Sequence, residues 1–422
     1  MTVYYFSNNP NGFVTGKRFS IDRPCVTIMA AGMGGDSLGH WHFTDDGRRD
    51  TMSTATATDK PPYNVPTMDD VRSIPWNGLT VASTFSGCGG SSTGYRMAGY
   101  KVVWASEFIE AARESYAANM GPDTILDGRD IRTVEPQSIL DAMRMEPGEL
   151  DLLDGSPPCA SFSTAGKREK GWGKVKKYSD GTQRTDDLFF EFSRLIRGIK
   201  PRTFVAENVS GLVKGTAKGY FLEILADLKA CGYAVKCKVL DAQWLGVPQQ
   251  RQRTIFVGVR NDIDLPPAHP KPLSYRYSVR DALPEIISVP YLTTGKQPIR
   301  RTAAKPCPAV CSFNIGGAGN IAEVRAIHDE SGEWSTGDIT DTVAPTVRAG
   351  RAGRAGALHV QSKTEKRKFT IAELKRICAF PDDFILTGSY AQQWERLGRA
   401  VPPVMMRAVA ETIRDQILSR DD

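Results

Sequence analysis

The sequence predicts an α/β fold, in which a mostly parallel, Rossmann-like sheet is joined by a smaller, irregular β-rich domain. Two observations lead to this fold class. In the first 260 residues, short apolar runs rich in β-branched residues alternate with helical patterns. From about residue 261 to residue 363 this alternation stops, and prolines, glycines and short strand-like runs replace it. A chain of 422 residues is long enough for one large domain and one small one.

Five apolar runs are the strand candidates, and each is followed by polar residues. They are residues 79–84, 102–106, 150–153, 203–206 and 254–259. Strands that alternate with helices form a mostly parallel sheet covered on both faces, which binds ligands at the carboxyl ends of its strands. Two more helices are expected near the C-terminus. One is capped by Thr370 with Glu373 three residues later, and one follows Pro402 and Pro403.

These patterns divide the chain into four parts: an N-terminal extension with its linker (1–66), a main domain (67–260), the irregular domain (261–363) and a C-terminal return to the main domain (364–422). Residues 22–30 of the extension line up with residues 341–349 of the irregular domain. Chance similarity among loops rich in Pro, Gly and Ala is one explanation. Our hypothesis is instead that residues 1–55 form a small β extension related to the irregular domain.

Composition favours a soluble protein with a polyanionic partner. The chain carries 54 Lys and Arg against 48 Asp and Glu, a net charge of +6. Basic residues gather between Lys167 and Arg184 and again between Arg348 and Lys368. No cationic leader and no apolar window of about 20 residues occur, so we expect a cytoplasmic protein without a membrane partner. The eight cysteines indicate neither a disulfide framework nor a metal site.

The first two strand ends predict a nucleotide-like cofactor. The glycines of the turn Ser86 to Gly90 let the backbone approach a ligand closely, although alone they are also typical of a plain strand-to-helix turn. Glu107 stands about where an open sheet places an acceptor for ribose hydroxyls. Asp130 could accept from an adenine amino group while Ile131 packs on the ring. Because no helix N-terminus is clearly offered to a pyrophosphate, S-adenosylmethionine fits better than a dinucleotide.

The step Pro157-Pro158-Cys159 follows the third strand. Two prolines restrict the backbone dihedrals, so the cysteine after them is held rigidly and aimed out of the sheet edge. Taken alone, these three residues are also compatible with an ordinary turn. A cysteine presented in this way is a candidate nucleophile, and the other strings of the sequence decide between the two interpretations.

Six strings in a fixed order carry a resemblance to a known family. They are Thr84 to Gly90, Pro157 to Cys159, Glu207 to Val209, Gln249 to Arg253, Phe380 to Phe384 and Ala400 to Pro403. Together they closely resemble the motif series of the DNA (cytosine-5) methyltransferases of bacteria and bacteriophages, over about residues 79–415. One position departs from the family: Arg399 stands where an asparagine is usual, which puts one wall of the cofactor site in doubt.

The resemblance implies a reaction and the residues that carry it. Cys159 would add to carbon 6 of a flipped cytosine, and the methyl group of S-adenosylmethionine would then pass to carbon 5. Glu207 would contact the ring nitrogen, Asn208 would orient the loop, and Arg251 and Arg253 would supply a positive field and grip the nucleotide. The cofactor residues carried over are Phe85, Ser86, Gly87, Cys88, Gly89, Gly90, Glu107, Phe108, Asp130, Ile131, Pro157, Ala400 and Val401.

Double-stranded DNA is the expected partner. Base flipping requires a segment that closes over the target, and residues 160–186 form a polar, Gly-containing loop rich in Lys and Arg. The resemblance makes residues 261–363 the target-recognition domain. The predicted DNA contacts are Ser161, Ser163, Lys167, Arg168, Lys170, Lys174, Lys176, Lys177, Arg348, Arg351 and Arg354.

Two rival functions stay open at this point: a tRNA methyltransferase of the same mechanism, and a catalytically silent DNA-binding regulator. The intact Cys159, Glu207 and Arg251 argue against the silent protein. We expect a monomer with a role in restriction-modification or phage self-protection. A partner endonuclease cannot be inferred from this chain.

Overall fold

The computed structural model describes residues 2–8, 14–20, 60–158, 176–177, 182–183, 187–213, 218–284, 290–291, 337–338, 359–361 and 366–420. The chain divides into two compact units, residues 1–59 and residues 60–422. In the first unit, strands β1 (Thr2–Asn8) and β2 (Val14–Ser20) pair antiparallel as a hairpin. The relation of this unit to the irregular domain stays a prediction.

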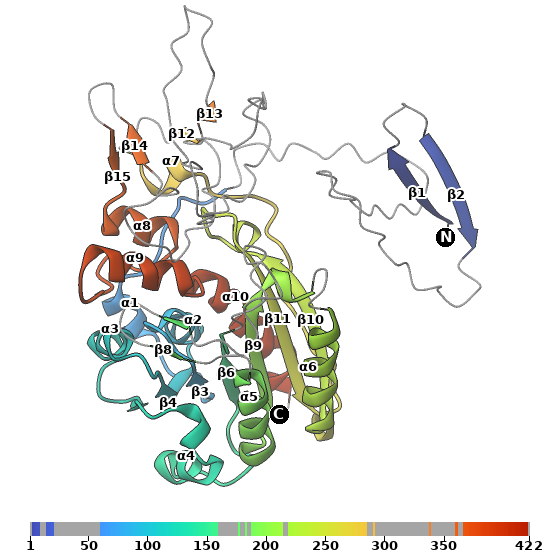
Figure 1. Ribbon diagram of the computed structural model, residues 1–422, viewed down its shortest axis with the longest axis vertical. Helices are drawn as coiled ribbons and strands as arrows, with labels where there is room; N and C mark the ends of the chain where they lie inside the picture. Colours follow the sequence, from blue (N-terminus) through green and yellow to red (C-terminus); the bar gives the residue numbers. More distant parts are fainter. Residues whose placement is uncertain are drawn as a thin grey trace, which may run out of the picture. The chain divides into compact units, whose positions relative to one another are not determined.

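A seven-stranded sheet forms the centre of the second unit (Figure 1). Its strands lie in the order β10 (Tyr233–Asp241), β11 (Gln252–Arg260), β9 (Thr203–Val209), β6 (Leu152–Gly155), β3 (Thr80–Thr84), β4 (Lys101–Ser106) and β5 (Ile125–Asp127). The five strands from β9 to β5 run parallel to one another. Strands β11 and β10 join antiparallel at one edge. The mostly parallel sheet predicted from the sequence is confirmed.

Strands β5 and β10 are absent from the sequence prediction. Strand β5 has three residues, which is too short to produce a recognisable apolar run. Strand β10 lies at the edge of the sheet, and its centre alternates apolar residues with Lys236 and Lys238. That alternation is typical of an antiparallel strand with one solvated face.

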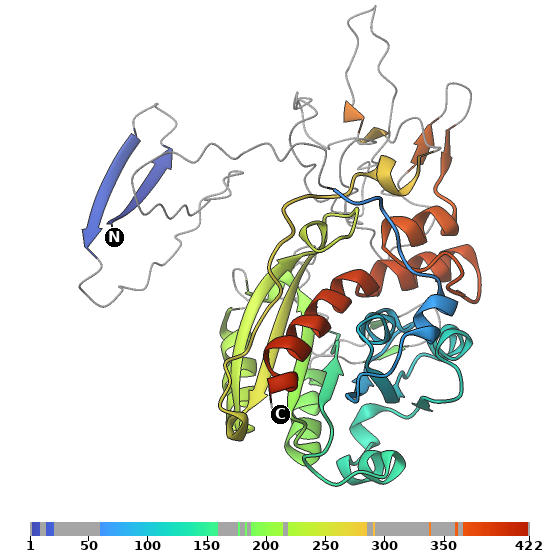
Figure 2. The same ribbon diagram turned by 180° about the vertical axis from the view of Figure 1, so that it is seen from behind.

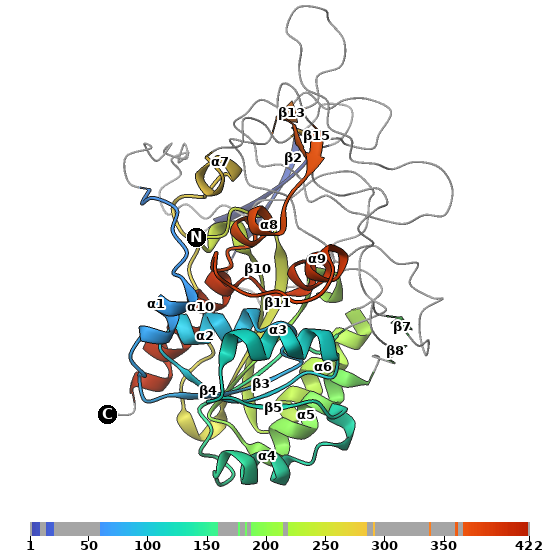
Figure 3. The same cartoon turned by 90° about the vertical axis from the view of Figure 1, so that its left-hand side faces the viewer.

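Helices cover both faces of the sheet, as a parallel sheet requires. Helices α4 (Pro136–Met143), α5 (Leu188–Ile199) and α6 (Lys218–Ala230) pack on one face, where Phe192 and Ile224 meet Trp104 and Phe204. Helices α2 (Gly90–Met97) and α10 (Pro403–Gln416) pack on the other. Figure 3 shows the two layers with the sheet between them, and Figure 2 shows α10, in red, lying along the sheet.

The C-terminal segment returns to the sheet and completes a third apolar cluster. Helix α3 (Glu110–Met120) contributes Tyr116 and Met120, which pack with Phe380 and Trp394. Helices α1 (Met68–Ser73), α8 (Ile371–Ile377) and α9 (Tyr390–Arg399) surround this cluster. The predicted cap is confirmed, since the Thr370 side chain accepts from the amide of Glu373 and the Glu373 carboxylate accepts from the amide of Thr370.

The remaining elements are short. They are α7 (Val279–Ala282), β7 (Lys176–Lys177), β8 (Thr182–Gln183), β12 (Pro290–Tyr291), β13 (Gly337–Asp338), β14 (His359–Gln361), β15 (Lys366–Lys368) and the 3-10 turns η1 (Ile131–Thr133), η2 (Ser210–Val213), η4 (Ala242–Trp244), η5 (Asn261–Ile263) and η6 (Leu418–Arg420). Most of the predicted recognition domain lies outside the described residues, so that assignment stays a prediction.

Among the described helices, none combines the length and the hydropathy that crossing a bilayer needs.

Candidate active site

Glu207 and Arg253 face each other where β9 and β11 run side by side. In the antiparallel register, Glu207 pairs with Ile255, so Arg253 projects from the same face of the sheet two residues along β11. The Nε atom of Arg253 lies 2.6 Å from Oε1 of Glu207, and both side chains are nearly buried. The structure therefore brings two of the predicted catalytic residues together as an ion pair.

Asn208 connects the end of β9 to the end of β6. Its Nδ2 donates a hydrogen bond of 3.1 Å to the carbonyl oxygen of Pro157, and its Oδ1 accepts from the amide of Val209 at 2.8 Å. Both Asn208 and Pro157 are buried. Cys159 itself lies outside the described residues, and Pro157 precedes it by two positions. Asn208 thus holds the backbone that leads into the candidate nucleophile.

Asp154 is a buried carboxyl group that the sequence analysis did not select. Its Oδ2 accepts from Ser83 Oγ at 3.0 Å and its Oδ1 accepts from Tyr95 OH at 3.1 Å. Burial raises the pKa of this carboxyl to about 7, and the nearby charge of Glu207 adds to the rise. An acidic residue at the end of an apolar strand, five positions before Cys159, is the signal that could have identified it.

Arg251, also predicted to be catalytic, contacts the C-terminal segment of the chain. The residue is 1% exposed, and its guanidinium group donates to the carbonyl oxygens of Gly398, Arg399 and Ala400 at 2.7 to 3.2 Å. These contacts bind the C-terminal end of α9 to the start of β11. The guanidinium group of Arg251 thus binds backbone carbonyls of the C-terminal segment.

The Gly-rich turn forms the other side of the site. Residue Phe85 and the glycines Gly87 and Gly89 adopt positive φ angles of 53°, 57° and 98°. The amide of Gly87 donates to Glu107 Oε2 at 2.8 Å, and the amide of Ile109 donates to Oε1 at 2.7 Å. Burial raises the pKa of Glu107 despite these hydrogen bonds. A carboxylate is therefore fixed beside a turn whose backbone is open to a ligand.

The other predicted residues of this turn have structural contacts. Ser86 donates to the carbonyl oxygen of Ser83 at 2.9 Å. Burial raises the pKa of the Cys88 thiol to about 12, so this cysteine is not a nucleophile near neutral pH. A Cβ atom on Gly90 would lie 2.4 Å from the carbonyl oxygen of Val401 and 3.3 Å from the Cβ of Ala400. The segment held by Arg251 therefore packs directly against the Gly-rich turn.

Arg399, the departure from the family pattern, also lies near this site. Its Nη2 is 2.6 Å from Oε1 of Glu395, one turn earlier on α9. Its positive charge, together with that of Arg113, counteracts part of the rise in the pKa of Glu107. Arg399 thus adds positive charge near the carboxylate that is predicted to bind the cofactor.

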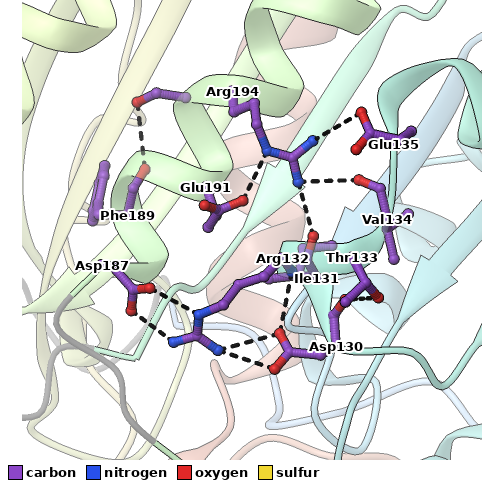
Figure 4. A network of polar contacts seen from close by, with 11 residues as sticks. Asp130, Ile131, Arg132, Thr133, Val134, Glu135, Asp187, Phe189, Glu191 and Arg194 are labelled. Carbon is purple, nitrogen blue, oxygen red and sulfur yellow. Dashed lines mark hydrogen bonds and ion pairs between the residues drawn. The ribbon is translucent and has the colours of Figure 1, made fainter.

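Phe108, Asp130 and Ile131 lie on the loops that follow β4 and β5. Phe108 is 41% exposed and Ile131 is buried. The Asp130 carboxylate contacts Arg132, whose guanidinium group also contacts Asp187 (Figure 4). Neither Arg132 nor Asp187 was selected from the sequence, because their pairing joins positions 55 residues apart.

Most of the predicted DNA contacts lie outside the residues that the structure describes. Residues outside the described part are Ser161, Ser163, Lys167, Arg168, Lys170, Lys174, Arg348, Arg351 and Arg354. Lys176 and Lys177 form the short strand β7, which pairs with β8. Among the described residues, no group of three or more His, Cys, Asp or Glu side chains could hold a metal ion.

Comparison with known proteins gives one consistent result. Residues 79–415 match the family model for C-5 cytosine-specific DNA methylases. Type II methyltransferase M.NgoFVII of Neisseria gonorrhoeae and type II methyltransferase M1.HphI of Haemophilus parahaemolyticus are each 30% identical over 355 residues, which cover 79% of this chain and 86% of the relative.

Solved structures with the same fold are more distant in sequence. A protein described as a DNA modification methyltransferase encoded within a prophage (E. coli) aligns over 81% of this chain and 100% of its own, with a TM-score of 0.55 and 20% identity. Spodoptera frugiperda DNMT2 aligns over 78% of this chain and 98% of its own, with a TM-score of 0.52 and 18% identity. These similarities show the fold alone.

Proposed function

Since this chain belongs to the C-5 cytosine-specific DNA methylase family and is a DNA cytosine-5 methyltransferase, we propose that Cys159 is its nucleophile, Glu207 its acid, and S-adenosylmethionine its methyl donor. The observation that carries this assignment is the corner formed by β6 and β9. There, Asn208 binds the carbonyl oxygen of Pro157, and the neighbouring Glu207 pairs with Arg253. The acid and the backbone leading to the nucleophile therefore belong to one hydrogen-bonded unit.

Carbon 5 of cytosine is too weak a nucleophile to take a methyl group directly. Addition of the Cys159 thiolate to carbon 6 makes carbon 5 enamine-like and divides one difficult step into easier ones. Negative charge that develops on the ring is offset by a proton that the Glu207 carboxyl donates or shares at the ring nitrogen next to the amino-bearing carbon. After methylation, carbon 5 releases its hydrogen as a proton to water, the sulfur leaves carbon 6 as a thiolate, and the ring nitrogen returns its proton to Glu207, which restores the aromatic base.

Arg253 and Asn208 act by positioning. The ion pair with Arg253 restricts the Glu207 side chain, so less conformational entropy is lost when a base binds. Arg253 also supplies the positive charge that favours a thiolate and the bound nucleotide. Arg251 positions the turn at residues 398–400 and, through it, the wall of the cofactor site at Val401.

The described residues fit S-adenosylmethionine. Gly87 has a positive φ angle and open space where a Cβ would lie, and the partly buried Glu107 carboxylate offers acceptors for ribose hydroxyls. Phe108, Ile131 and Asp130 would bind the adenine, and Phe85, Ala400 and Val401 would close the remaining walls. When bound, this cofactor supplies an electrophilic methyl group.

The substrate we propose is double-stranded DNA, bound by residues 160–186 and read by residues 261–363. The net charge of +6 and the basic residues of both segments favour phosphate contacts. Several relatives are named as type II methyltransferases, which supports a restriction-modification role. We further propose a monomer that acts in the cytoplasm of a prokaryotic host or a phage-infected cell.

Transfer of labelled methyl from S-adenosylmethionine tests this function. The full chain is incubated with unmethylated duplex DNA and, in parallel, with tRNA. Modified cytosines are then mapped by sequencing. Incorporation into duplex DNA at a defined sequence is expected, and incorporation into tRNA alone would contradict the DNA substrate.

A further inference from the structure

The turn that follows β5 is bound to helix α5 by two arginines (Figure 4). Arg194 of α5 donates to the carbonyl oxygens of Ile131 and Val134 at 2.9 and 3.0 Å. Arg132 of the turn reaches in the opposite direction, to Asp187 just before α5. The backbone of the turn and the helix are therefore held together from both sides.

Asp130, the predicted acceptor for the adenine amino group, is oriented by Arg132. Its Oδ1 accepts from the amide and from Nη1 of Arg132 at 3.1 and 3.2 Å, and its Oδ2 accepts from Nη1 at 3.1 Å. An ionised carboxylate has about four acceptor positions, so these three contacts leave capacity for one more donor. The Asp130 carboxylate is therefore held in one orientation and still has an acceptor position for a ligand.

Arg132 is in turn oriented by Asp187. The two side chains form a bidentate pair, with Nε to Oδ2 at 2.8 Å and Nη2 to Oδ1 at 2.6 Å. Asp187 occupies the N-cap position of α5, yet its side chain makes no cap hydrogen bond. The carboxylate that would ordinarily cap the helix is instead directed at Arg132, in a planar geometry that a lysine cannot reproduce.

We propose that Arg132 is a positioning residue for the cofactor's adenine: held by Asp187, it fixes the Asp130 carboxylate so that Asp130 accepts a hydrogen bond from the exocyclic amino group. This inference rests on the proposed cofactor site and adds the residue that makes it selective. A carboxylate already oriented loses less freedom on binding than a mobile one. A site built around such an acceptor rejects a base that lacks the donor.

The test compares the affinities of the full chain for S-adenosylhomocysteine and S-inosylhomocysteine, in which a carbonyl oxygen replaces the amino group. The wild type should prefer the adenine compound by about tenfold or more. Arg132→Gln should reduce that preference to within about threefold, and Arg132→Lys and Asp187→Asn should give intermediate ratios. Arg129→Gln is the matched control, because Arg129 lies on the same loop but pairs with Asp127, the last residue of β5. It should keep the full preference.

The outcomes separate the inference from the function on which it rests. If Arg132→Gln weakens both compounds equally and leaves their ratio unchanged, Arg132 only supports the fold and the proposal is wrong. If Asp130→Asn keeps the wild-type ratio, Asp130 does not bind the amino group, and both the adenine assignment and the inference fail. Thermal unfolding of each variant shows whether a reduced preference for the adenine compound comes from misfolding.

Discussion

Glu207 and Arg253 form a nearly buried ion pair across two antiparallel strands, with 2.6 Å between Oε1 and Nε. Charges in such a position are screened by salt much less than surface charges are. The pair lies beside Asn208, which binds the carbonyl oxygen of Pro157. The proposed catalytic acid, its proposed positioning residue and the backbone that leads to the proposed nucleophile are thus connected within the described structure.

Replacement of the acid should separate catalysis from folding. Glu207→Gln keeps the size of the side chain but cannot supply the carboxyl proton, so kcat should fall by about 10² to 10³. Methyl transfer and thermal unfolding measure the two effects. Glu411→Gln, at an exposed ion pair with Arg407, is the control and should leave kcat unchanged. Wild-type kcat in Glu207→Gln would contradict the assignment.

Loss of the Asn208 amide should reduce both stability and activity. Asn208→Ala leaves the buried carbonyl of Pro157 without its donor, which should cost about 1–3 kcal/mol of unfolding free energy. The control is Asn77→Ala, since the Asn77 side chain also donates to a backbone carbonyl, that of Ala98 at 3.0 Å, at a more exposed position. Both variants should be less stable in urea, but only Asn208→Ala should lose methyl transfer. Equal activities in the two variants would exclude a positioning role for Asn208.

Arg251 should prove essential for stability and for the cofactor wall. Arg251→Lys cannot reproduce the hydrogen bonds to three successive carbonyls, so we expect a loss of about 2–4 kcal/mol in urea unfolding. The affinity for S-adenosylhomocysteine should fall as well, because the segment at Val401 packs on Gly90. If Arg251→Lys weakens only DNA binding and leaves stability and cofactor affinity unchanged, this account is wrong. Arg251 would then grip the target nucleotide, as the sequence analysis predicted.

The buried carboxyl of Asp154 predicts a specific pH dependence of stability. Its pKa rises from the usual 3.8 to about 7 in the folded protein. The folded state therefore retains a proton that the unfolded chain releases, and this contribution to stability is lost as the pH rises from about 4 to about 7. The slope is at most about 1.4 kcal/mol per pH unit.

Asp154→Asn removes this slope. Urea unfolding at pH 5 and pH 8 should show that the variant gains stability relative to the wild type at the higher pH. An identical difference between the two proteins at both pH values would show that Asp154 does not titrate in this range.

The fold was largely predictable, because five strands coincide with continuous apolar runs and parallel pairing follows from their alternation with helices. Strand β5 was too short to detect, and β10 carries lysines on its solvated face. Glu207 and Arg253 were each selected from the sequence for a different role, and their ion pair follows from the antiparallel pairing of β9 and β11, in which neighbours share a sheet face.

What the sequence did not reveal are contacts between distant segments. Arg251 meets carbonyls about 150 positions later in the chain, and backbone carbonyls leave no sequence signal. Arg132 and Asp187 belong to different motifs and meet only because α5 packs beside the turn after β5. Side-chain type and spacing predicted which residues could react, whereas tertiary packing determined which ones hold them in position.

The most direct test of the central claim is capture of the bond between Cys159 and the base. Duplex DNA that carries 5-fluorocytosine at the target position cannot lose a proton from carbon 5 after methylation, so the adduct should persist. Mass spectrometry of the digested full chain should find the modified base on the peptide containing Cys159, and Cys159→Ala should form no adduct. An adduct on another cysteine, or methyl transfer that continues in Cys159→Ala, would contradict this account.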